Sequence, residues 1–210
     1  KIGAGVADWL RAAPGYALQA VIGRNGAAPP APLTIDTAGP AALRAFGATL
    51  LAQGDLWTVG AAALIDDGLR ARLAAVAAQH GTELRLFTGW ITGPNLCPSG
   101  AGATLHIEQS APRLGPAPGV LFHGPLAEAA ARFPDHLNTA TAAALCGPGI
   151  GATTITLLST EDGGPHIIRA RFAMPGQTID TETRFGDGPH PVTQAIIAAL
   201  QARGAWLRYG

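Results

Sequence analysis

The feature that most constrains the fold of this chain is the regular alternation of strand-like and helix-like segments over its first 89 residues. Apolar residues at helical spacing, bounded by Pro or Gly, predict three helices, at residues 4–12, 40–53 and 66–80. Runs of aliphatic and β-branched residues predict four strands, at residues 17–22, 33–37, 55–60 and 83–89. Strands that alternate with helices are typical of a parallel sheet covered by helices. The first part of the chain is therefore predicted to be an α/β unit.

The pattern changes after Gly89, where a Gly/Pro-rich connection begins. Beyond it, runs of alternating polar and apolar residues predict strands at 103–110, 152–160, 166–173 and 177–185. Helices are predicted at 124–132, 139–146 and 191–203. Alternating strands joined by Gly/Pro turns favour a mostly antiparallel sheet. The second part is therefore predicted to be an α+β unit.

Composition limits the kinds of partner. The 210 residues are 48% hydrophobic, which is enough for a substantial core, yet no apolar run approaches the roughly 20 residues of a membrane helix. The first ten residues include Asp8 where a secretory signal is apolar. The 14 Lys and Arg balance 14 Asp and Glu without a basic cluster, which argues against a nucleic-acid partner. We expect a soluble cytoplasmic protein that acts on small molecules, with Cys97 and Cys146 as buried, reduced thiols.

Glycines near the first residue resemble part of a dinucleotide-binding fingerprint. The fingerprint Gly-x-Gly-x-x-Gly lies between a first strand and a first helix, where side chains would obstruct the turn and the pyrophosphate. Gly3 and Gly5 fit its first two glycines only with Asp8 at the third. Gly3 fits better as the third glycine, with the first strand and the other two glycines upstream of Lys1. A plain helix start remains an alternative.

Arg24 and Asn25 follow the strand predicted at 17–22, at the place of the residue that contacts the adenosine ribose. An acidic residue there favours NAD, whereas arginine pairs with a 2′-phosphate. Arg24 with Asn25 therefore favours binding of NADP, or of both NADP and NAD. The alternative is that Arg24 is an ordinary surface residue.

The six histidines are candidates for proton transfer, because imidazole titrates near neutral pH. His80 is best explained as a cation at a helix end, and His106 and His123 as hydrogen-bonded residues at strand ends. His166 follows the turn-like run TEDGGP and opens a predicted strand. A turn of this kind can present a side chain to a cleft, so His166 is the candidate catalytic residue.

The second half contains the run VLFHGPLAEAAARFPDHLNTATAAALCGPGIG. This run resembles the L-aspartate dehydrogenase family, in which Val-Leu-Phe-x-Gly, an Ala-rich helix, Phe-Pro-x-x-x-Asn, a second Ala-rich helix and Gly-x-Gly follow one another. His166 lies 28 residues after Asn138, where the family has its catalytic histidine. The first half, from TIDTAGP to ELRLFTG, is similar to the family's succession of strands, Ala-Gly, Val-Gly-Ala and helices.

The resemblance implies a Rossmann-like NAD(P)-binding domain at 1–92, completed by the last helix at 190–210, and a catalytic domain at 93–189 that also forms a homodimer. It implies transfer of a hydride from the α-carbon of L-aspartate to NAD or NADP, giving iminosuccinate and then oxaloacetate and ammonia, in connection with NAD biosynthesis. His166 is the proton-transfer or substrate-orienting residue in this interpretation. The expected cofactor-binding positions are Gly3, Arg24, Asn25, Gly39, Gly60, Trp90 and Asn138. The alternatives are tight turns at Gly39 and Gly60 and a simple helix N-cap at Asn138.

Three departures from the family pattern bear on activity. Trp90 replaces a small residue, Gly164-Pro165 replaces Asn-Thr before the histidine, and Val192 replaces a basic residue. Because a dicarboxylate substrate requires cations, His136 and Arg169 are the expected substitutes, although an arginine on a strand can also be solvated. A related dehydrogenase or imine reductase for another amino acid, or a nucleotide-binding relative without turnover, are the alternative functions.

Overall fold

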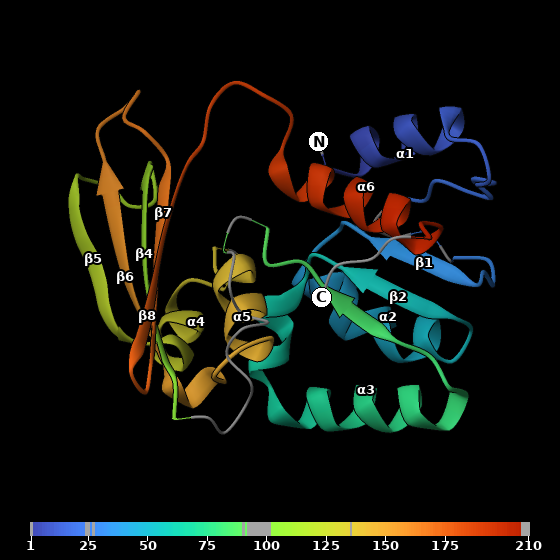
Figure 1. Cartoon of the computed structure of the whole chain (residues 1–210), viewed down its shortest axis with the longest axis horizontal. Coiled ribbons are helices and arrows are strands. Elements are labelled where there is room, and N and C mark those ends of the chain that lie inside the picture. The colour runs from blue at the N-terminus through green and yellow to red at the C-terminus, as the bar shows by residue number, and fades with distance from the viewer. Residues whose placement is uncertain are drawn as a thin grey trace. The chain divides into compact units, whose positions relative to one another are not determined.

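The computed structural model describes residues 2–23, 26, 28–89, 91, 102–134 and 136–206. The chain divides into two compact units, one formed by Lys1–Phe87 with Pro189–Gly210 and the other by Thr88–Gly188 (Figure 1). None of the described helices is long and apolar enough to cross a membrane. The predicted combination of an α/β unit with an α+β unit is confirmed.

The first unit is built on a parallel sheet in the order β1-β2-β3. These strands are Leu33–Asp36, Asp55–Thr58 and Leu84–Leu86. Helices α2 (Pro40–Leu51) and α3 (Asp67–His80) follow the first two strands, with the 3-10 turn η1 (Ala61–Ile65) before α3. Pro40 fits the first helical turn, where no backbone N–H is needed, and the Asp66 carboxylate caps α3 by accepting from the Leu69 N–H at 3.0 Å.

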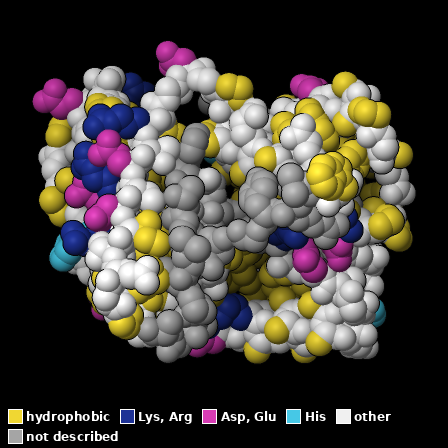
Figure 2. Space-filling view, in the orientation of Figure 1, with side chains coloured by type: hydrophobic (Ala, Val, Ile, Leu, Met, Phe, Trp, Pro, Cys, Tyr) yellow, Lys and Arg dark blue, Asp and Glu magenta, His cyan; other side chains and the backbone are white. Residues whose placement is uncertain are grey.

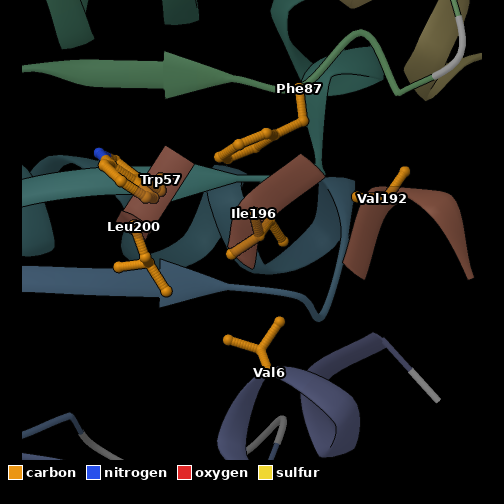
Figure 3. Close-up of a cluster of buried hydrophobic side chains, with 6 residues drawn as sticks. All are labelled: Val6, Trp57, Phe87, Val192, Ile196 and Leu200. Carbon is orange, nitrogen blue, oxygen red and sulfur yellow. The ribbon is translucent and has the colours of Figure 1, made fainter. Parts of the chain in front are cut away.

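Helices α1 (Ile2–Ala12) and α6 (Pro191–Arg203) pack side by side in this unit, although they come from opposite ends of the sequence (Figure 1). Figure 3 shows the core that they share with β2 and β3: Val6, Trp57, Phe87, Val192, Ile196 and Leu200. Burying such side chains contributes roughly 1.5–3 kcal/mol each relative to exposure. The last helix is therefore part of the core of the first unit.

Polar contacts fix the position of α6. The Tyr16 hydroxyl donates to the Leu200 carbonyl at 2.5 Å, and Arg203 donates to the Asp55 carboxylate at 2.8 Å. Arg203 and Arg85 also lie over the Trp57 ring, with guanidinium carbons 5.8 and 4.8 Å from its centroid. The C-terminal turn of α6 is thus held against β2.

The second unit is a five-stranded sheet in the order β5-β6-β4-β7-β8. Its strands are β4 Thr104–Pro112, β5 Gly119–Pro125, β6 Thr153–Thr160, β7 Ile167–Met174 and β8 Gln177–Arg184. Only β4 and β6 pair in parallel, so the sheet is mostly antiparallel as predicted. Helices α4 (Leu126–Arg132) and α5 (Asn138–Leu145) lie beside the sheet, and the turn η3 (Ile150–Ala152) leads into β6 (Figure 1).

The structure corrects several local predictions. Residues 17–22 form no strand, because no described strand pairs with them, and Val21 is 62% exposed. Residues 119–125 form β5, which the sequence pattern did not reveal since Gly and Pro interrupt it. His106 and His123 lie within β4 and β5, not at strand ends. Cys146 is exposed, not buried, and Cys97 lies outside the described residues.

We predict that Ile196→Ala destabilises the protein by about 2–5 kcal/mol, because Ile196 is fully buried and its removal leaves a cavity between α6 and the sheet. Urea unfolding followed by tryptophan fluorescence measures the loss. Ile197→Ala is the matched control, since this neighbour is only half-buried and should cost clearly less. Equal losses for the two variants would contradict the proposed role of α6.

Candidate functional site

The loops after β1 and β2 are joined by a set of hydrogen bonds that starts from Asp36. One oxygen of the Asp36 carboxylate accepts from the Ala38 N–H at 2.8 Å, and the other accepts from the Thr58 hydroxyl at 2.7 Å. The same Thr58 oxygen accepts from the Gly60 N–H at 2.9 Å. Thr58 is fully buried, so these bonds satisfy a hydroxyl that water cannot reach. The carboxyl ends of the two strands are therefore held in one fixed arrangement.

Gly39 and Gly60 face each other across this edge of the sheet. A Cβ on Gly60 would lie 2.8 Å from the Gly39 carbonyl, so a larger residue there would force the loops apart. Gly39 has φ 98°, and although it is buried, nothing lies within 4 Å of where its Cβ would point. A backbone beside open space at the carboxyl edge of a parallel sheet fits the approach of a nucleotide cofactor.

Gly3 lies in the first turn of α1 beside the same loop. A Cβ on Gly3 would lie 2.5 Å from the Thr37 hydroxyl oxygen, one residue after Asp36. Gly3 therefore lies beside Thr37, two residues before Gly39, and Gly39 lies against Gly60. The N-terminal turn of a helix favours anions such as phosphate through its N–H groups and its dipole. Arg24, Asn25 and Trp90 lie outside the described residues.

His166 lies in the second unit, directly before β7, where it pairs with the residue after β8. The Phe185 N–H donates to the His166 carbonyl at 2.9 Å, which extends the β7-β8 ladder by one pair. The two rings are stacked, with centroids 3.8 Å apart and an interplanar angle of 6°. His166 is half-buried. The imidazole thus has a defined plane at the end of the sheet.

Asn138 and His136 lie at the other predicted part of the site, the start of α5. Asn138 is the first residue of the helix, and the N-cap position is taken by Leu137. The N-cap alternative for Asn138 is therefore wrong by one position. His136 is exposed, and its backbone N–H donates to the Phe133 carbonyl at 3.2 Å. Both residues thus lie at the N-terminal end of α5, whose following residues Ala140–Ala144 are buried.

Arg169 does not share a face with His166. Side chains alternate along a strand, so Arg169 points to the face opposite that of His166 and Phe185. There it binds the carboxylates of Glu108 at 2.5 Å and Glu182 at 2.6 Å. The hydrogen bond from Arg169 is the main cause that lowers the pKa of Glu182. Arg169, expected as a cation for a dicarboxylate substrate, thus binds two carboxylates of the protein itself.

The face that carries Arg169 is strongly charged and ordered by its own ion pairs. Arg171 lies 3.7 Å from Asp180, and Figure 2 shows basic and acidic side chains mixed over the strands of this unit. A groove of about 390 Å³ lies between β4, β7 and β8 on this face. His106 lines it, and the pKa of His106 is lowered, first by burial and then by the nearby His123. These charges are already paired, so the groove is not the candidate active site.

The sequence analysis did not identify three residues that contact the predicted site residues or the loops that carry them: Asp36, Thr58 and Phe185. Asp36 and Thr58 are the last residues of β1 and β2. Asp36 could have been found as an Asx turn, in which an aspartate carboxylate accepts a hydrogen bond from the backbone N–H two residues later. Phe185 gave no local signal, because its contact with His166 depends on the register of two strands.

Comparisons with known proteins agree on one family. The family model described as "Aspartate dehydrogenase, C-terminal" matches residues 101–206. The chain is 33% identical to L-aspartate dehydrogenase 2 of Bordetella bronchiseptica, over 80% of this chain and 73% of that protein. It is 29% identical to L-aspartate dehydrogenase of Ralstonia pickettii, over 97% of this chain and 93% of that protein. The crystal structure of aspartate dehydrogenase from Thermotoga maritima matches with a TM-score of 0.75 at 16% identity, covering 98% of this chain and 95% of that one.

We predict that Asp36→Ala lowers the free energy of unfolding by about 1–3 kcal/mol, because the Ala38 N–H and the buried Thr58 hydroxyl lose their acceptor. The affinity for a nicotinamide dinucleotide should fall about tenfold as the loops loosen. Denaturant unfolding and fluorescence titration measure the two effects. Asp8→Ala removes an exposed carboxylate on α1 and should change stability by less than about 0.5 kcal/mol. Unchanged affinity in Asp36→Ala would show that the joined loops do not bind the cofactor.

Proposed function

This chain belongs to the aspartate dehydrogenase family, and on that premise we propose that it oxidises L-aspartate to iminosuccinate, or reduces iminosuccinate in the reverse direction. Hydrolysis of iminosuccinate gives oxaloacetate and ammonia. The observation that carries the proposal is the placement of His166, held by a cross-strand pair and a ring stack at the end of a sheet. The agreement of the family model with two relatives that cover most of the chain supports it.

The cofactor would be held at the carboxyl edge of the parallel sheet. Gly39 and Gly60 allow close approach of its phosphates and ribose, and the N-terminal turn of α1 at Gly3 offers N–H donors. When bound, the nicotinamide supplies a two-electron hydride acceptor. We infer NADP as the preferred form from Arg24, with Asn25 beside it, and we place Trp90 and Asn138 in the nicotinamide part of the site.

His166 is proposed to move the proton that accompanies the hydride. Oxidation of an α-ammonium group to an iminium releases one proton, and a neutral imidazole can accept it at a ring nitrogen. In the reverse direction the imidazolium returns that proton. His136 is proposed as a polar contact for a substrate carboxylate, because it is exposed at the entrance to α5.

A related amino-acid dehydrogenase is the second candidate, and Val192 favours it. The residue at this position is basic in the family pattern, whereas Val192 is 7% exposed and packs in the core of the first unit. It therefore gives no charge to a second carboxylate. A panel of L-aspartate, L-glutamate and neutral amino acids distinguishes the two candidates by their kcat/KM. We also propose a homodimer located in the cytoplasm, as the family resemblance implies.

We predict that His166→Gln lowers kcat by about 10²–10⁴-fold, the usual range for a positioned general acid or base. The Kd for NADPH should stay within about twofold, since His166 is not among the glycine loops that hold the cofactor. Reduction of oxaloacetate with ammonia, followed by NADPH absorbance, measures turnover. His123→Gln is the control, because His123 is exposed on a strand and hydrogen-bonds Thr156 instead.

Turnover by His166→Gln at the rate of the unaltered protein would remove His166 from the mechanism. Binding of NADPH by the unaltered protein without any turnover on the whole panel would favour the nucleotide-binding interpretation.

We predict that Arg24→Ala raises KM for NADPH about tenfold and leaves KM for NADH unchanged, since only NADPH carries the 2′-phosphate that an arginine binds. Steady-state kinetics with each cofactor provides the measurement. Arg72→Ala, an exposed arginine on α3, is the control for a general loss of positive charge. An equal effect on both cofactors would contradict a role for Arg24 in cofactor preference.

A further inference from the structure

We propose that Phe185 is a positioning residue for His166, and that it holds the plane of the imidazole in which proton transfer takes place. This inference rests on the proposed function. The two rings are stacked with centroids 3.8 Å apart and planes 6° from parallel. The Phe185 N–H also donates to the His166 carbonyl at 2.9 Å, so both the backbone and the ring of each residue face the other.

The three residues just before His166 are Gly163, Gly164 and Pro165. They have no polar side chains that could hold a ring nitrogen. A Cβ on Gly164 would lie 2.8 Å from the Thr160 hydroxyl oxygen, so this tight turn has no room for one. Support for the ring from the opposite strand is therefore the arrangement that this sequence favours.

The backbone of the turn is itself anchored. Arg113 donates two hydrogen bonds to the Asp162 carboxylate, at 2.8 and 3.0 Å, and the Gly164 N–H donates to the Glu161 carbonyl at 2.9 Å. These contacts position the backbone of the turn before His166. The Phe185 ring restricts rotation of the imidazole, because turning the imidazole out of the stack loses the contact between the faces.

Stacking suits a proton-transfer residue because it uses the face of the ring and not its edge. The nitrogen lone pair and the N–H bond both lie in the plane of the imidazole. A phenyl ring on one face therefore fixes the directions along which a proton enters or leaves without competing for the nitrogens. Because misplacement by about 1 Å can cost a factor of 10² in rate, a fixed plane matters for turnover.

A purely structural role makes a different prediction. Aromatic cross-strand pairs stabilise antiparallel sheets by roughly 0.2–1 kcal/mol, so Phe185 could simply close the end of the β7-β8 pair. In that case its replacement lowers stability and leaves kcat of the folded enzyme unchanged. A positioning residue lowers kcat at temperatures where the protein is fully folded.

The test compares Phe185→Leu with Phe185→Tyr in the full chain. Leucine keeps an apolar contact but no ring, so kcat should fall about tenfold while KM for the cofactor stays the same. Tyrosine restores the ring and should recover most of the rate. Phe46→Leu is the matched control, since Phe46 is 41% exposed on α2 and the change should leave kcat unaltered. A kcat for Phe185→Leu within twofold of the unaltered enzyme would overturn the proposal.

Proton NMR of the imidazole C–H signals separates this inference from the proposed function. The ring current of Phe185 should shift the His166 signals upfield, and His166→Gln identifies them by their loss. Phe185→Leu should return them to the region of the other histidines, and Phe185→Tyr should keep them shifted. Signals that stay in place in Phe185→Leu would refute the stack. If the stack is seen but no amino acid is turned over, the proposed function fails and the geometry of the pair stands.

Discussion

The packing of α6 against β2 and α1 is the interaction on which the organisation of the chain depends. Ile196 and Leu200 of the last helix are buried against Trp57 of the central strand, across more than 130 residues of sequence. The parallel sheet would otherwise expose the side of β2 that carries Trp57. Since α6 completes this core, the whole second unit is an insertion between β3 and α6, and both of its ends connect to one folded body.

This arrangement explains which parts of the fold the sequence could reveal. The helix at 191–203 was predicted with its observed bounds because Pro191 starts it and apolar residues repeat at helical spacing. The strand at 17–22 has equally good composition, but a strand requires a neighbour to pair with, and composition carries no information about neighbours. Conversely, β5 contains Gly124 and Pro125 and still forms, because β6 lies beside it. The local sequence pattern therefore predicts helices better than strands, because a helix makes its backbone hydrogen bonds within itself and a strand makes them with a neighbour.

The same limit applies to the candidate site. Gly3, Gly39 and Gly60 could be selected from sequence, since turns and close approach require glycine. In the structure Gly39 lies against Gly60, and Gly3 lies beside Thr37 in the same loop as Gly39. The hydrogen bonds of Asp36 and Thr58 join two strands that are 22 residues apart, and no spacing rule connects them. Arg169 was selected for its charge, but the alternation of side chains along β7 puts it on the face opposite His166. Which face a residue occupies follows from register, which the sequence alone does not provide.

The side chain of a histidine can be oriented by hydrogen bonds or by an aromatic ring, and His166 has an aromatic contact. A histidine followed and preceded by polar side chains can be held by hydrogen bonds, at the cost of occupying its nitrogens. In this chain the residues before it are Gly164 and Pro165, and the opposite strand supplies an aromatic face. The charged residues of the sheet lie on its other face, where Glu108, Arg169 and Glu182 bind one another. The ion pairs and the His166–Phe185 pair thus lie on opposite faces of the sheet, so these carboxylates do not contact the imidazole of His166. Separation of this kind follows from the period of two along β7, which puts the ion pairs on one face and the His166–Phe185 pair on the other.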